Sequence, residues 1–424
     1  MDNSKVCIVG LGYVGLPLAM LFASHYKTFG YDTNIRRVKA IMSGIDETGQ
    51  VDNKILKQNI KNGFRCSSNA LKIQPSDVYI IAVPTPVDTA NRPDLTPLKK
   101  ASETVGRILK PGNTVIYEST VYPGLTEDIC LPIIEKYSNL KRDKDFFAGY
   151  SPERVNPGDK VHTLENTVKI TSGATPEAAD FIDQLYNSVL SSGTHRASSI
   201  KVAEAAKIIE NAQRDVNIAF MNEAAKIFNA LNIDTHDIIN ASATKWNFIN
   251  MKPGLVGGHC IGVDPYYLIE QAKAYGIAPR IMTTARNLNN SMGEYVAHRV
   301  IRLLNLKGCK VNNARILILG FTFKENCADS RNTKVIDIIN VLSEYTSNID
   351  VCDPVINRQE TISEYKINLI NSQPDKIEEH YDAIIHCVSH DAFQNINFRR
   401  LLNPNGIIYD VKGSLNRDMV EERL

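Results

Sequence analysis

Short apolar runs alternate with amphipathic stretches over the first part of the chain. The runs KVCIVG, TFGYD, VYIIAVP, TVIYEST, DFFAGYS and VKITSG are each bounded by Gly, Pro or polar residues, which is typical of strands. Strands that alternate with helices favour βαβ units and a parallel sheet. We therefore expect an α/β domain over residues 1–195.

The pattern changes near Ser198. The run SSIKVAEAAKIIENAQRDVNIAFMNEAAKIFNAL has no Pro or Gly, and its apolar positions follow the helical period, with Val202 and Ile209 among them. A helix this long usually buries a face against another domain or subunit, so we expect a homodimer or a higher homo-oligomer. The Gly- and Pro-rich stretch MKPGLVGGHCIGVDP predicts a loop between helices, within a helical domain over residues 196–308.

A second α/β pattern follows in RILILG, IDVCDP, DAIIHCVS and GIIYDVKG. It predicts a smaller doubly wound domain over residues 309–424. The expected fold class is α/β, with two Rossmann-like doubly wound domains joined by a long central helix and a helical middle domain.

Composition narrows the class of partner and compartment. The 48 Lys and Arg residues nearly balance the 47 Asp and Glu residues, which gives no reason to expect a nucleic-acid or membrane-surface partner. The eight cysteines form no C-x-x-C pair, so neither a metal site nor a disulfide framework is indicated, and a reducing cytoplasm is expected. The apolar run VGLPLAMLFA lacks a basic flank and a cleavage site, and is interpreted as a buried helix rather than a signal segment.

A glycine motif follows the first predicted strand. Gly10, Gly12 and Gly15 have G-x-G-x-x-G spacing and open a predicted helix, the context that gives this motif its force. Its glycines allow a tight turn, close approach of a pyrophosphate and close helix–strand packing. Tyr13 and Val14 belong to the same candidate cofactor site. The alternative is a glycine turn that only packs.

Asp32 ends the second predicted strand, about twenty residues after the motif. A carboxylate there accepts hydrogen bonds from ribose hydroxyls and repels a 2′-phosphate, which favours NAD over NADP. Arg37 is a further candidate cofactor-binding residue. Arg36 and Arg37 keep NADP open, because an arginine can accommodate that phosphate. Thr85 and Thr120 end later strands, where ligands of open α/β sheets bind, although both could be ordinary turn residues.

Cys260 lies in the most informative loop, GLVGGHCIGVDP. The surrounding glycines expose the thiol, and a catalytic cysteine needs a neighbour that favours the thiolate. His259 is adjacent in sequence but need not face it. The alternative is an inert cysteine in a glycine-rich turn.

Two further features favour a catalytic interpretation. Glu204, Lys207 and Asn211 lie along one face of the long predicted helix, with Lys207 among apolar residues. Glu153 follows a proline at a strand end, a placement suited to a general base. The alternatives are a solvated surface lysine and a capping or turn glutamate.

Six motifs occur in order along nearly the whole chain: G-x-G-Y-V-G, V-P-T-P, S-P-E-R-x-x-P-G, K-x-x-x-N, G-G-H-C-x-x-x-D-P and F-K-x-x-x-x-D-x-R. The sequence resembles the UDP-glucose/GDP-mannose dehydrogenase family. The forms SPERVNPGDK and PGLVGGHCIGVDPYYL are most similar to the bacterial branch that acts on UDP-N-acetylhexosamines, GlcNAc or GalNAc, for surface polysaccharides.

The resemblance implies a role for each matching residue. Cys260 matches the nucleophile, Lys207, Asn211 and Asp264 the groups that stabilise the oxyanion and order water, and Glu153 and Thr120 the base and water-holding positions. Arg331 matches a residue at the NAD site. Substrate contacts are implied for Glu153, Arg154, Val155, Lys207, Asn211, Ile249, Asn250, Met251, Lys252, Pro253, Gly257 and Lys324.

One position departs from the family pattern. Relatives that act on UDP-glucose carry a second glutamate four residues after the first, and Pro157 stands there in this chain. This disfavours UDP-glucose as the substrate.

The implied reaction is a four-electron oxidation of a C6 alcohol to the acid with two NAD, through a thioester on Cys260. The alternatives are a UDP-glucose 6-dehydrogenase, a two-electron NAD-dependent alcohol dehydrogenase and a non-catalytic sugar-nucleotide sensor.

Overall fold

The computed structural model describes residues 4–73, 75–153, 163–370 and 373–424. The chain divides into two compact units, residues 1–210 with 266–277, and residues 211–265 with 278–424. The long helix α7, Ile200–Ala230, runs through the first boundary.

The first unit is built on an eight-stranded sheet in the order β3-β2-β1-β4-β5-β6-β7-β8. The strands from β3 to β6 in this order pair in parallel, β7 is antiparallel to β6, and β8 is parallel to β7. The strands are β1 Lys5–Val9, β2 Lys27–Tyr31, β3 Arg65–Ser67, β4 Val78–Ile81, β5 Thr114–Tyr117, β6 Phe147–Tyr150, β7 Lys169–Gly173 and β8 Thr194–Arg196.

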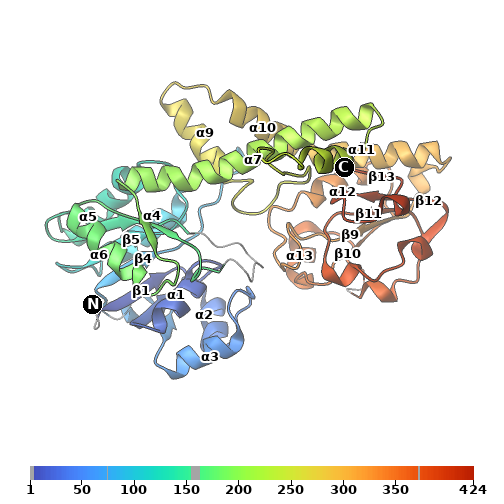
Figure 1. The fold of residues 1–424 in the computed structure, drawn as a ribbon. Helices are drawn as coiled ribbons and strands as arrows, with labels where there is room; N and C mark the ends of the chain where they lie inside the picture. Colours follow the sequence, from blue (N-terminus) through green and yellow to red (C-terminus); the bar gives the residue numbers. More distant parts are fainter. Residues whose placement is uncertain (1–3, 74, 154–162, 371–372) are drawn as a thin grey trace. The chain divides into compact units, whose positions relative to one another are not determined.

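Apolar clusters cover both faces of this sheet, because nearly every residue of β1, β4 and β5 is buried. One cluster joins the sheet to α1, Gly15–Ala23, α3, Asn53–Lys61, and α6, Pro176–Asn187. The other joins it to α4, Thr96–Gly106, α5, Leu131–Ser138, and the start of α7 (Figure 1). Helix α2, Ile35–Met42, follows β2.

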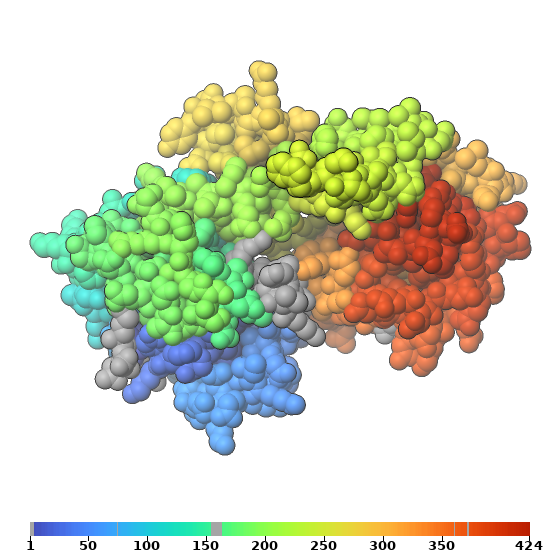
Figure 2. Space-filling model, in the orientation of Figure 1, coloured from blue at the N-terminus to red at the C-terminus, as the bar shows by residue number. Residues whose placement is uncertain are grey.

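The second unit contains a five-stranded sheet in the order β10-β9-β11-β12-β13, with all neighbours parallel. Its strands are β9 Ile316–Leu319, β10 Ile349–Cys352, β11 Tyr381–His386, β12 Leu402–Asp410 and β13 Glu422–Arg423. Helices α11, Met292–Leu306, and α12, Val335–Ser343, pack on one face, and a second apolar cluster covers the other. Helix α13 is Arg358–Tyr365. The C-terminal segments, orange to red, gather into one body in Figure 2.

The helical region comprises α7, α8, Thr235–Ser242, α9, Asp264–Ala274, and α10, Arg280–Asn290. A buried ion pair fastens α10 to α7, with Arg286 Nη1 2.5 Å from Asp215 Oδ1. Asn289 also donates to that oxygen, at 2.7 Å. The stretch between α8 and α9 forms a loop, as expected. The last two residues of the predicted loop, Asp264 and Pro265, instead begin α9.

The expected fold class is confirmed, as the two α/β patterns form a mainly parallel and an all-parallel sheet, each covered on two faces. The run VGLPLAMLFA forms the buried helix α1. The short strands β3, β8 and β13 were not predicted, since two or three residues carry no readable period. Among the described residues, no helix is both long enough and apolar enough to cross a membrane.

Candidate active site

The glycine loop after β1 has the shape that its spacing predicts. Gly10 has φ +94°, and a Cβ there would lie 2.5 Å from the Ala82 carbonyl oxygen. A Cβ on Gly15 would overlap the Gly10 carbonyl, whereas one on Gly12 would meet no described atom within 4 Å. Among the described side chains none caps the first turn of α1, which begins after Val14. Open space beside Gly12 and uncapped N–H groups suit a diphosphate.

Asp32 and Arg37 both hold this loop, from different sides. Asp32 Oδ2 accepts from the Leu11 amide at 2.8 Å, and the Asp32 side chain remains partly exposed. Arg37 is buried beneath, donates from Nε to the Leu11 carbonyl at 2.9 Å and pairs through Nη2 with Asp46 at 2.7 Å. Arg37 therefore supports the loop backbone, and Arg36 lies exposed beside Glu47.

Thr85 and Thr120 lie just beyond the carboxyl ends of β4 and β5, and both are partly exposed. Ser119 joins their two loops. Its hydroxyl accepts from the Val83 amide at 3.0 Å and donates to the Val83 carbonyl at 2.8 Å. Ser119 was not among the residues expected from the sequence, because a serine beside a strand end is common.

Glu153 and Lys207 meet inside the first unit. Glu153 lies after β6, Lys207 lies on α7, and Glu153 Oε2 is 3.3 Å from Lys207 Nζ. The side chains are only 7% and 3% exposed. A buried lysine next to a carboxylate suits a base or an oxyanion site better than a solvated surface role. Arg154, Val155 and Pro157 lie outside the described residues.

A buried polar cluster lies beneath Glu153. Lys169 Nζ donates to the Pro152 carbonyl at 3.0 Å and lies 3.2 Å from Glu118 Oε2. The Tyr186 hydroxyl donates to the other oxygen of Glu118. Burial raises the pKa of Glu118, against the lowering effect of Lys169. This cluster holds the backbone that carries Glu153.

Glu204 connects α7 to the loop after Thr120. Its carboxylate accepts from the Gly124 amide at 2.5 Å and the Thr126 amide at 3.0 Å, at the start of the π-helix Thr126–Cys130. Burial raises the pKa of Glu204 to about 7, although these hydrogen bonds lower it. On the helix face that the sequence indicated, Glu204 therefore holds the loop after Thr120 against α7, and Lys207 lies one turn further along.

In the second unit, Cys260 precedes the first turn of α9. The amides of Val263 and Asp264 donate to the Cys260 carbonyl at 3.0 and 2.8 Å. Asp264 is held by Asn211 of α7, whose Nδ2 lies 2.5 Å from Asp264 Oδ2, and both residues are buried. The structure therefore brings Asn211 and Asp264 together next to the cysteine loop.

His259 points toward Asp329, with Nδ1 3.5 Å from Asp329 Oδ2. Burial, then the charge of Arg331, lower the pKa of His259 to about 4 against the opposite effect of Asp329. His259 is therefore uncharged near neutral pH and cannot stabilise a Cys260 thiolate as an imidazolium. Arg331 makes a two-pronged contact to Asp329, at 3.0 and 2.8 Å.

The expected substrate loop is anchored at its centre. Asn222 of α7 accepts from the Gly254 amide at 2.8 Å and donates to the Gly254 carbonyl at 3.0 Å. Ile249, Asn250 and Lys252 remain exposed, Met251 is partly exposed and Pro253 is buried. A Cβ on Gly257 would lie 2.6 Å from the Asn332 carbonyl oxygen, so the loop packs tightly on the segment that contains Arg331.

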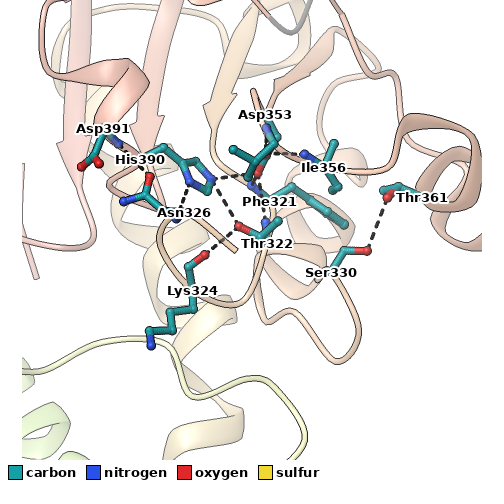
Figure 3. A network of polar contacts seen from close by, with 11 residues as sticks. Phe321, Thr322, Lys324, Asn326, Ser330, Asp353, Ile356, Thr361, His390 and Asp391 are labelled. Atoms are coloured by element: carbon teal, nitrogen blue, oxygen red, sulfur yellow. Dashed lines mark hydrogen bonds and ion pairs between the residues drawn. The ribbon is translucent and has the colours of Figure 1, made fainter. Parts of the chain in front are cut away.

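Lys324 follows β9 and is partly exposed. Its carbonyl accepts from the Thr322 hydroxyl at 3.0 Å. Asp353 and His390 complete the polar network around this turn (Figure 3). Both residues were missed by the sequence analysis, although Asp353 ends a strand as Asp32 does, a signal that could have revealed it.

Comparisons with known proteins agree with this organisation. Residues 4–190 match the NAD binding domain of the UDP-glucose/GDP-mannose dehydrogenase family, residues 201–291 its central domain, and residues 317–417 its UDP binding domain.

Similar proteins cover essentially the whole chain. A UDP-N-acetyl-D-glucosamine 6-dehydrogenase of Pseudomonas aeruginosa is 49% identical, with 100% of both chains covered. Protein CapL of Staphylococcus aureus is 50% identical over 98% of this chain and 97% of its own. The solved structure of UDP-D-ManNAc dehydrogenase from Pyrococcus horikoshii has a TM-score of 0.90 at 29% identity, covering 99% of this chain and 98% of that one.

Proposed function

Since the chain belongs to the UDP-glucose/GDP-mannose dehydrogenase family and carries its NAD-binding domain, we propose that it oxidises the C6 hydroxyl of a UDP-N-acetylhexosamine to the carboxylate, with two NAD per sugar. The product is a UDP-linked uronic acid for polysaccharide synthesis. Two relatives, of P. aeruginosa and Salmonella typhi, are named as UDP-N-acetyl-D-glucosamine 6-dehydrogenases at 49% and 46% identity. UDP-N-acetylglucosamine is therefore the first substrate to test, ahead of the GalNAc epimer.

The N-terminal loop fits the cofactor. The open side of Gly12 and the uncapped start of α1 would hold the diphosphate, and Asp32 would accept from the adenosine ribose. Tyr13, Val14, Thr85 and Thr120 border the same strand ends. When bound, NAD accepts a hydride, and two NAD together take four electrons from the alcohol.

In the proposed mechanism Glu153 accepts the proton of the C6 hydroxyl as a hydride leaves C6 for the cofactor, and Cys260 Sγ then adds to the resulting aldehyde carbon to give a thiohemiacetal. Its oxidation gives a thioester, and water releases the acid and the free thiol. Lys207 and Asn211 would donate to the negative oxygen of each tetrahedral state, where one lost donor costs about 2.7–4 kcal/mol. Asp264 and Thr120 would orient the water.

The observation that carries the proposal is the turn at Cys260. It starts a helix whose first carboxylate, Asp264, is buried and fixed by Asn211. A buried, hydrogen-bonded carboxylate four residues after a partly exposed cysteine suits thioester hydrolysis.

The proposal extends to domains and assembly. We propose the division at residues 1–195, 196–308 and 309–424, and a homodimer that covers an apolar face of α7. Phe220 and Ile227 lie one heptad apart on that helix and are 69% and 51% exposed, the spacing at which apolar side chains of two helices pack against each other. Phe220→Glu should shift the protein to monomer in analytical ultracentrifugation, whereas an unchanged dimer would place the interface elsewhere.

The direct test assays NADH release from a panel of UDP-sugars. We expect UDP-N-acetylglucosamine or its GalNAc epimer to be preferred over UDP-glucose, with two NADH formed per sugar. A ratio of one would indicate a simple alcohol dehydrogenase, and binding without NADH would indicate a sensor.

Cys260→Ser tests the covalent step. Because serine is a much weaker nucleophile at neutral pH, steady turnover should fall on the order of a hundredfold or more. Cys309→Ser, a partly exposed cysteine of the same unit, is the matched control and should retain activity. Full turnover by Cys260→Ser would exclude the thioester.

A further inference from the structure

The turn that carries Lys324 is held from behind by one buried histidine. His390 follows β11 and is 1% exposed. Its Nδ1 accepts from the backbone amide of Asn326 at 3.0 Å. Its Nε2 lies 3.1 Å from Asp353 Oδ2 and 3.2 Å from the Thr322 hydroxyl oxygen (Figure 3).

These contacts determine the tautomer of His390. A backbone N–H can only donate, so Nδ1 must be unprotonated. The Thr322 hydroxyl already gives its hydrogen to the Lys324 carbonyl, at 3.0 Å, so it can only accept from the ring. Nε2 therefore carries the hydrogen, which it directs at Asp353 and Thr322, and the imidazole is neutral.

Asp353 is in turn fixed by the backbone. Its Oδ2 accepts from the Phe321 and Thr322 amides at 2.7 and 3.1 Å, and its Oδ1 accepts from the Val355 and Ile356 amides at 3.0 and 3.1 Å. With four backbone donors on it, the carboxylate is a rigid support for the ring. The ring transmits that rigidity to residues on both sides of Lys324, through Thr322 and Asn326.

We propose that His390 is a positioning residue of the nucleotide-sugar site, which holds the Lys324 turn through its Nδ1 lone pair. The Lys324 side chain points away from this network in Figure 3, as a ligand-binding group on a fixed turn would. Preorganisation of this kind lowers the entropic cost of binding. The inference rests on the proposed function only in giving Lys324 a UDP-sugar to bind.

Two substitutions separate the two nitrogens of the ring. His390→Asn keeps an acceptor near the Nδ1 position and loses the donor toward Asp353. His390→Gln keeps a donor near the Nε2 position and loses the acceptor for the Asn326 amide. Both should lower the melting temperature, because both disturb a buried network.

The substrate constants should differ between them. His390→Gln should raise the KM for the UDP-sugar and the Kd for UDP, measured by calorimetry, about tenfold, the value of one buried hydrogen bond. Its kcat should stay within about twofold of the wild type. His390→Asn should keep KM and Kd within about threefold. Equal constants in the two variants, raised or not, would overturn the proposal.

Further variants keep the test decisive. Thr322→Val removes the bond to the Lys324 carbonyl with little change in shape and should also raise the Kd for UDP. It keeps the proposal testable if His390→Gln fails to fold, and an unchanged Kd in Thr322→Val would contradict the proposal. His386→Gln alters another buried histidine of the same sheet, which pairs with Asp410, and should lower stability without the KM effect. UDP binding does not require turnover, so weakened binding in His390→Gln supports this inference even if the wild type forms no NADH.

Discussion

The two sheets share one arrangement at their first strands, a glycine with positive φ and an aspartate that follows the next strand. Gly10 follows β1 with φ +94°, and Gly320 follows β9 with φ +84°. After the next strand, Asp32 accepts from the Leu11 amide at 2.8 Å, and Asp353 accepts from the Phe321 amide at 2.7 Å. In both places a carboxylate fixes the residue that follows the glycine.

The difference lies in what surrounds that carboxylate. The first domain continues with Gly12 and Gly15 and leaves Asp32 partly exposed, whereas the second has Thr322 and Glu325 at those positions and buries Asp353 completely. His390 contacts Asp353 from Nε2, 3.1 Å from Oδ2. The same frame thus leaves a carboxylate partly exposed in one domain and buries it as an internal support in the other.

Removing each carboxylate should separate the two uses most clearly. Asp353→Ala leaves four backbone amides and His390 without their acceptor, so it should lower the free energy of unfolding by about 3–5 kcal/mol. Asp32→Ala should cost only about 1 kcal/mol, since water can replace a partly exposed carboxylate. Denaturant titration of both variants would measure this, and equal losses would refute the distinction.

The contributions of Glu204 and Asp353 to stability should depend on pH with opposite signs. Burial raises the pKa of Glu204 from 4.5 to about 7, so its contribution is fully present below pH 4.5 and is lost as the pH rises to about 7. Burial alone would raise the pKa of Asp353, but hydrogen bonds from His390 and the backbone outweigh it and lower the pKa below 3.8. The contribution of Asp353 to stability is therefore present above that pH and is lost as the pH falls.

Glu204→Gln should therefore remove a loss of stability between pH 4.5 and 7, at most about 3.5 kcal/mol at roughly 1.4 kcal/mol per pH unit. Hydrogen exchange of the segment after Thr120 would locate the effect. Glu210→Gln, on the same helix and more exposed, serves as the control and should leave the slope unchanged. If the two variants share one slope, Glu204 is not the titrating group.

The smallest expected effect concerns cofactor affinity. Asp32→Ala should raise the KM for NAD about tenfold to a hundredfold, because a charged acceptor for two ribose hydroxyls is worth about 1.4–3 kcal/mol. The KM for the UDP-sugar should not change, since Asp32 belongs to the NAD-binding domain. Steady-state kinetics with each substrate varied in turn would show this, and a change in both constants would indicate a general loss of structure.

The sequence by itself determined the order of the main elements, and it predicted a set of candidate chemistry-bearing positions. Apolar runs such as KVCIVG and RILILG could be interpreted because a buried parallel strand is apolar on both faces. The Gly10 motif and Asp32 lie close together along the chain, so their spacing carries the information. The ordered motifs, which include Cys260, Lys207 and Asn211, then indicated one family. The matches to the three domains of that family confirm that the chain belongs to it.

Only the tertiary structure decided which residues support other residues from a buried position. Arg37 could have served a 2′-phosphate, but burial against Asp46 and Leu11 makes it a support of the glycine loop. His259 is next to Cys260 in sequence, yet it turns to Asp329 and stays uncharged near neutral pH. His390 and Asp353 are 37 residues apart. No local pattern reports such a contact, because desolvation and long-range hydrogen bonds depend on which strands the fold brings side by side.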